Sequence, residues 1–162
     1  MITIDLERAQ SLVAECIAER GEDYVYVKDE GSYSCQYVHG ISDVWNEDTE
    51  EYEQVTFDDA TPGCLVGMAL HKAGVPLEKM GTRSRNEDGS FDLISKLESD
   101  GLVWVSMEAQ NYLGNAQCSQ DLGAPWKRAA DAAARGKSLE NTYDGAGRKT
   151  GEFVERDNYA VA

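Results

Sequence analysis

Long apolar runs are missing from this 162-residue sequence. The longest, such as GCLVGMAL at residues 63–70, fall well short of the roughly 20 residues that a transmembrane helix requires. The opening segment MITIDLERAQ also lacks the basic start and apolar middle of a signal peptide. We therefore expect a cytoplasmic protein that has no membrane partner.

Basic side chains are scarce in the first 60 residues, which hold three of them against sixteen acidic ones, a net charge of −13. The other 102 residues contribute only −2 to the total of −15. An anionic surface of this kind repels nucleic acid and attracts basic proteins. The asymmetry therefore argues against direct nucleic-acid binding and favours a basic protein surface as the partner, while the oligomeric state stays open.

Cysteine and histidine are also few. The four cysteines (Cys16, Cys35, Cys64 and Cys118) are widely separated and lie in apolar patterns. Without an export signal, this pattern predicts free, buried, reduced thiols instead of a disulfide framework.

The length suits one domain with a hydrophobic core. Apolar residues at steps of three and four predict a first helix over residues 5–20. A β-hairpin is predicted around the turn at residues 29–32, and a second pairing is predicted between the segments ISDVW and EQVTF at residues 41–45 and 53–57. These patterns indicate an α+β fold, with a small antiparallel sheet at residues 24–57 packed on helices and a mainly helical C-terminal half.

The C-terminal half begins with an apolar segment that we expect to be the central helix, with Thr61 as its cap, Pro62 at its first position and Gly74 after its end. Further helices are predicted after the caps Ser90 and Ser106 and after Pro125, and a strand is predicted for LVWVS. For the domain organisation, we predict a single domain over residues 1–136, followed by a polar, glycine-containing tail over residues 137–162.

Two segments resemble recurrent segments of small uncharacterised proteins of actinobacteria and their phages. They are PGCLVGMALHKAGVPLE (Pro62–Glu78) and YLGNAQCSQDLGAPWKRAADAAA (Tyr112–Ala134). The resemblance implies an actinobacterial or phage origin and assigns no activity or catalytic residue. It does not extend to the acidic insertion at residues 40–59.

A catalytic pair would have to be built from Cys64 and His39. A thiol in the first turn of a helix is activated by the unpaired N–H groups there, and His71 lies two turns away, out of reach. Because both flanks of Cys64 are apolar, a buried structural thiol is the favoured interpretation and a cysteine hydrolase the alternative. The spacing of Cys35, His39, Cys64 and His71 does not suit a metal ion, and no cofactor is expected.

The acidic insertion is the most distinctive feature, with eight carboxylates between Asp43 and Asp59 and no basic residue. It lacks the glycine and glutamate positions of a helix-loop-helix calcium loop. Four interpretations stay open: loose cation binding, a solvated loop that confers solubility, a mimic of nucleic-acid phosphates, and a docking surface with aromatic anchors. The residues of the predicted docking surface are Trp45, Glu47, Asp48, Glu50, Glu51, Tyr52 and Glu53.

From the sequence we therefore expect a non-enzymatic, acidic, phage-encoded binding protein that engages a basic surface of a host protein, for host takeover or for evasion of defence. A cysteine hydrolase and a structural or assembly protein are the alternatives.

Overall fold

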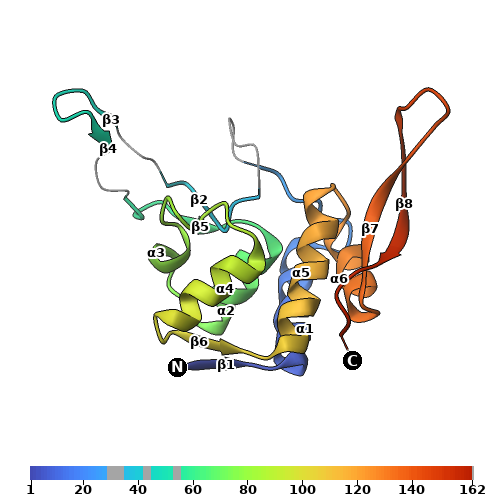
Figure 1. Cartoon of the computed structure of the whole chain (residues 1–162), viewed down its shortest axis with the longest axis horizontal. Coiled ribbons are helices and arrows are strands. Elements are labelled where there is room, and N and C mark those ends of the chain that lie inside the picture. Colours follow the sequence, from blue (N-terminus) through green and yellow to red (C-terminus); the bar gives the residue numbers. More distant parts are fainter. Residues whose placement is uncertain (29–34, 42–44, 53–55, 162) are drawn as a thin grey trace.

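The computed structural model describes residues 1–28, 35–41, 45–52 and 56–161 (Figure 1). It confirms the α+β class, with six helices and eight short strands among these residues. The helices are α1 (Leu6–Arg20), α2 (Leu65–Ala73), α3 (Leu77–Met80), α4 (Ser90–Ser99), α5 (Met107–Asp121) and α6 (Trp126–Ala134). The strands are β1 (Ile2–Ile4), β2 (Val38–His39), β3 (Trp45–Asn46), β4 (Glu51–Tyr52), β5 (Thr61–Pro62), β6 (Val103–Val105), β7 (Lys137–Tyr143) and β8 (Lys149–Asp157).

The strands form four separate two-stranded pairs around a helical body. β1 and β6 are parallel, and the other three pairs, β2–β5, β3–β4 and β7–β8, are antiparallel. Figure 1 shows the β3–β4 and β7–β8 hairpins projecting from opposite flanks of this body. Within the described residues, no helix is long and apolar enough to cross a membrane.

Helix α1 confirms the first predicted helix. The Asp5 side chain accepts a hydrogen bond from the backbone N–H of Arg8 at 2.8 Å, which satisfies one of the unpaired donors at the helix start. The apolar residues at helical spacing, from Ala9 to Ile17, are buried. They pack on α2 and α5, so α1 forms one wall of the core.

Helix α5 is buried on several sides and carries polar as well as apolar side chains in the core. Its cap, Ser106, is confirmed and accepts from the backbone N–H of Ala109. Asn115 and Ser119 are fully buried, and both bond to the backbone of distant segments: Asn115 to Tyr159, and Ser119 to Leu139. A buried polar side chain is tolerated when it is hydrogen-bonded, and these bonds fasten the C-terminal strands to α5.

Helix α2 starts three residues later than predicted. Thr61 and Pro62 do not cap and open the helix but form β5, paired with Val38 and His39 of β2. The helix begins at Leu65, with Cys64 as its N-cap residue. Proline pre-organises a first helical turn but fits equally well in a short edge strand, and the preceding β2 provides that pairing. The predicted end is confirmed, since Gly74 has a left-handed conformation with φ 111°.

Residues 137–157 form a hairpin where the composition predicted a polar tail. β7 and β8 pair from Lys137↔Asp157 to Tyr143↔Lys149. Leu139 is 3% exposed and packs with Ala124, Ala132 and Phe153. A strand is recognised in a sequence by alternating apolar and polar residues. These two strands are mostly polar, and the buried Leu139 is their anchor, so the sequence pattern does not predict the hairpin.

The cysteines are all free, as predicted. Cys16, Cys35 and Cys64 are buried, whereas Cys118 is exposed, which corrects the prediction for that residue. Burial raises the pKa of the Cys16 thiol to about 12, so this thiol stays protonated in the core at neutral pH.

Candidate functional site

The acidic insertion forms a short hairpin. Trp45 pairs with Tyr52 and Asn46 pairs with Glu51, so residues 47–50 make the turn. The Asn46 side-chain oxygen accepts from the backbone N–H groups of Asp48 and Thr49, at 2.9 and 3.2 Å, which stabilises the turn. A strand pairing therefore crosses the acidic stretch, but it joins Trp45–Asn46 to Glu51–Tyr52 and not the predicted segments 41–45 and 53–57. Residues 42–44 and 53–55 of those segments, Glu53 included, lie outside the described residues.

Two aromatic rings face each other on this hairpin. Trp45 and Tyr52 form an edge-to-face pair with ring centroids 4.9 Å apart, and their exposed fractions are 49% and 46%. An aromatic pair prefers this geometry, so the two rings hold each other in place while both stay accessible. The third aromatic residue of the insertion, Phe57, packs instead against Gly81 in the helical body.

Arg83 also contacts the hairpin. Its guanidinium lies 3.9 Å from the centroid of the Tyr52 ring, within the range of a cation–π interaction. Arg83 is not predictable as a site residue from the sequence, because it lies 31 positions after Tyr52, in a polar loop whose composition gives no signal for this contact. The interaction ties the hairpin to the loop between α3 and α4.

The carboxylates of the hairpin are open to solvent. Glu47, Asp48, Glu50 and Glu51 are all exposed, and among the described residues none of the four forms an ion pair. Four unneutralised charges beside an exposed aromatic pair give the two components that protein interfaces combine, a charged rim and aromatic anchors. The predicted docking residues other than Glu53, which lies outside the described residues, are therefore contiguous on one hairpin, which we call the acidic hairpin (residues 45–52).

The other candidate pair, Cys64 and His39, has no comparable geometry. Cys64 is fully buried, and the Nε2 atom of His39 lies 2.6 Å from the Tyr26 hydroxyl. The ring of His39 packs beside Gly63, with its Nε2 3.0 Å from the position that a Cβ atom would take there. A nucleophile must reach its substrate, and in this conformation the Cys64 thiol does not.

The backbone at the start of α2 is also occupied. The N–H of Leu65 donates to the Gln120 side chain at 2.7 Å, and the N–H of Cys64 donates to the Gln36 carbonyl at 2.9 Å. Gln120 in turn donates to the Cys35 sulfur at 3.3 Å. An oxyanion hole needs free donors of this kind, so the helix start is built as a packed structural junction. Burial raises the pKa of the Cys35 thiol and keeps it protonated.

The second histidine, His71, has a structural contact. Its Nδ1 atom lies 3.0 Å from the Val75 carbonyl, at the end of α2. No group of three or more histidine, cysteine, aspartate or glutamate side chains that could hold a metal ion occurs within the ranges that the structure describes. These residues bring together no candidate metal centre.

Comparisons with family models, with curated proteins and with solved structures returned no match to this chain.

Proposed function

We propose that this chain is a non-enzymatic binding protein whose acidic hairpin engages a basic surface of a partner protein. The observation that supports this proposal is the exposed edge-to-face pair of Trp45 and Tyr52 beside carboxylates without ion-pair partners in the described structure. A soluble loop needs charge but has no need of two exposed, ordered aromatic rings. Aromatic rings of this kind supply contact area at low entropic cost when a partner covers them.

The two components have different roles. The carboxylates attract a basic surface over distance and accelerate its encounter, whereas the rings supply contact area once the surfaces meet. The hairpin projects from the helical body (Figure 1), and Trp45 and Tyr52 remain about half exposed there even though Arg83 stacks on the Tyr52 ring. Binding should therefore be sensitive to salt through the association rate and sensitive to the aromatic rings through the dissociation rate.

The resemblance at residues 62–78 and 112–134 implies an actinobacterial or phage origin, and we propose the phage-encoded case. For such a protein the partner is a host protein, and the proposed outcome is host takeover or evasion of defence. The proposed partner surface is rich in lysine or arginine, because guanidinium and ammonium groups pair with the carboxylates and stack on the rings.

The test is affinity capture from a bacterial host lysate at low and high salt, comparing wild type with a variant that neutralises the hairpin. The variant combines Glu47→Gln, Asp48→Asn, Glu50→Gln and Glu51→Gln. We expect wild type to retain a partner at low salt and to bind it more weakly at high salt, because salt screens exposed charges. The variant should not retain this partner.

A charge-matched control separates the hairpin from net charge alone. It combines four substitutions at exposed acidic residues elsewhere, Glu7→Gln, Asp92→Asn, Glu108→Gln and Glu152→Gln. The control should retain the partner. Equal loss from both variants would show that net charge alone is responsible, and equal retention by both would refute a role for the acidic hairpin.

A further inference from the structure

The β7–β8 hairpin has one edge that no other strand of the described chain covers. β7 packs on α5 and α6, whereas β8 lies on the outer side of the hairpin (Figure 1). Among the described residues, β8 pairs with β7 alone. β8 is nine residues long and contains no proline, so it lacks two of the features that keep an edge strand from pairing with another chain.

The backbone of β8 points to this outer edge at every second residue. The Leu139 N–H donates to the Ser119 side chain of α5 at 2.8 Å and therefore points away from β8. Directly opposite residues of antiparallel strands direct their backbone groups either toward each other or apart. Because Glu155 lies opposite Leu139, its N–H and C=O point outward, and by alternation so do those of Phe153. In the described structure these outward groups have no hydrogen-bond partner.

The side chains of Glu152, Val154 and Arg156 lie together on one face of β8, because the side chains of a strand alternate between its two faces. The opposite face is the one that Leu139 shares, and it packs toward α6. Glu152 and Arg156 are exposed, and Val154 is partly buried. The strand therefore presents an acidic, an apolar and a basic side chain in turn, at equal spacing.

This order of side chains is complementary to itself. When a second copy of β8 runs antiparallel with the two Val154 side chains opposite each other, each Glu152 lies opposite Arg156 of the other copy. Two charge pairs then flank a central apolar contact, and cross-strand pairs of both kinds stabilise antiparallel strands. In the same register Phe153 lies opposite Glu155 of the other copy, so their outward backbone groups form hydrogen bonds with each other.

The two neighbouring registers are less favourable. Centring the pairing on Glu155 sets two carboxylates directly opposite each other, which is destabilising. Centring it on Phe153 sets Glu152 opposite Val154 and removes both charge pairs. That register also reaches Gly151, where the strand is irregular and φ is 82°. The side chains therefore select the register centred on Val154.

The charges of β8 are available to a second copy. The Nε atom of Arg156 donates to Glu140 at 3.3 Å, and the two terminal nitrogens of the same guanidinium make no hydrogen bond within the described residues. Glu152 has no ion pair in the described structure. Residues 137–157 carry four basic and five acidic side chains, a net charge of −1 against −15 for the whole chain. Repulsion between two copies is therefore weak at this surface.

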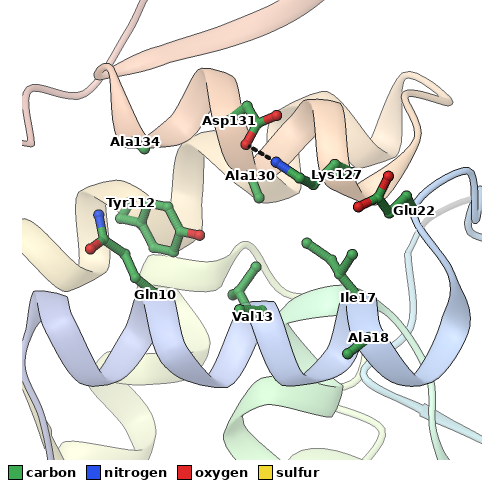
Figure 2. A pocket seen from close by; sticks show the side chains of 11 residues that line it. Gln10, Val13, Ile17, Ala18, Glu22, Tyr112, Lys127, Ala130, Asp131 and Ala134 are labelled. Carbon is green, nitrogen blue, oxygen red and sulfur yellow. Dashed lines mark hydrogen bonds and ion pairs between the residues drawn. The ribbon is translucent and has the colours of Figure 1, made fainter.

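The groove between α1 and α6, with a cavity volume of about 480 Å³, lacks such complementarity (Figure 2). Its walls are helices, whose backbone groups bond within each helix. Lys127 and Asp131 at its rim pair with each other at 2.6 Å. Within the described residues nothing in this groove specifies an occupant, whereas the edge of β8 presents backbone groups and charges that match a second copy.

We propose that two copies of this chain associate through β8 into a four-stranded antiparallel sheet. The backbone pairing of Phe153 with Glu155 and two Glu152–Arg156 pairs hold this dimer together. The acidic hairpin projects from the opposite flank (Figure 1), so the dimer carries two acidic hairpins on its outer sides. The association is independent of the proposed partner binding, and either proposal can fail without the other.

The test is sedimentation velocity of the full chain over a series of concentrations, at about 0.15 M salt. We expect a reversible monomer–dimer equilibrium for wild type. Glu152→Arg sets arginine against arginine at both charge pairs, and Arg156→Glu sets glutamate against glutamate. Each variant alone should raise the dissociation constant of the dimer by about tenfold or more, because two attractive pairs become repulsive.

An equimolar mixture of the two variants tests the pairing itself. It should restore the dimer, because the arginines of one chain then face the glutamates of the other at both positions. A variant that merely failed to fold could not be rescued in this way. Glu7→Arg on α1 changes the net charge as much as Glu152→Arg does, at an exposed position outside β8, and should dimerise like wild type.

Four results would overturn the proposal. A wild-type chain that stays monomeric up to roughly 1 mM has no specific self-association. Dimers that persist in either single variant form through another surface, and equal weakening by Glu7→Arg attributes the effect to net charge. Single variants that dissociate but form no dimer when mixed refute the pairing of Glu152 with Arg156. All variants are first checked for the wild-type far-ultraviolet circular dichroism spectrum.

Discussion

The two hairpins project from opposite flanks of the helical body and differ in chemistry (Figure 1). On β7–β8 the charges are largely paired: Lys137 with Asp157, Arg156 with Glu140, and Arg135, at the end of α6, with Glu155. On β3–β4 none of the four carboxylates that the structure describes has an ion pair, and two aromatic rings are half exposed.

The anchoring of the two hairpins differs as well. β7 is fastened by the buried Leu139, whose N–H donates to Ser119 of α5 at 2.8 Å. The acidic hairpin is fastened through the stacking of Arg83 on Tyr52. β7–β8 thus completes the fold, whereas the acidic hairpin leaves its carboxylates and rings exposed, as the proposed partner binding requires. Substitutions should therefore change stability in one hairpin and binding in the other.

The largest effect is expected at the anchor of β7–β8. Leu139→Ala should lower the free energy of unfolding by about 2–5 kcal/mol, because it removes a buried side chain and leaves a cavity between Ala124 and Ala132. Urea unfolding followed by circular dichroism measures this change. Tyr143→Ala on the same strand, where the ring is 60% exposed, is the control and should stay within about 0.5 kcal/mol of wild type. Similar losses from both would contradict the anchoring role of Leu139.

The next effect concerns binding. Trp45→Ala should weaken binding of the captured partner by about 2 kcal/mol, roughly thirtyfold, as for an interface anchor. The free energy of unfolding of this variant should differ from that of wild type by less than about 1 kcal/mol. Tyr143→Ala, an exposed aromatic of the other hairpin, should bind like wild type. Surface plasmon resonance with the captured partner measures both variants. If Tyr143→Ala were as defective as Trp45→Ala, the acidic hairpin would not be the specific surface.

The local patterns of the sequence predict most of the helices. The periodic burial of α1, the caps Asp5 and Ser106 and the stop at Gly74 are set by interactions within a few residues, which a sequence displays directly. The start of α2 could not be predicted in this way, because β5 exists only through its pairing with β2, more than twenty residues earlier. Long-range pairing overrides a local capping pattern.

The same contrast between local and long-range interactions applies to the candidate sites. The acidic hairpin was predictable because its charges and rings are adjacent in sequence. Arg83 was not, since its role depends on a contact with Tyr52, 31 positions earlier in the sequence. The pair of Cys64 and His39 shows the converse, because suitable residue types alone did not place the thiol within reach of solvent.

The smallest expected effect is a pH dependence of the folding stability that arises from Asp144 at the tip of β7–β8. Backbone N–H groups of Arg148 and Ala146 donate to the Asp144 carboxylate and lower its pKa. A lowered folded-state pKa stabilises the fold above the unfolded value of about 4, and this contribution is lost as the pH falls through the lower folded value. Asp144→Asn keeps an oxygen acceptor but removes the charge. Its urea midpoint should therefore fall less steeply than that of wild type below about pH 4, whereas parallel curves would show that the Asp144 charge does not stabilise the turn.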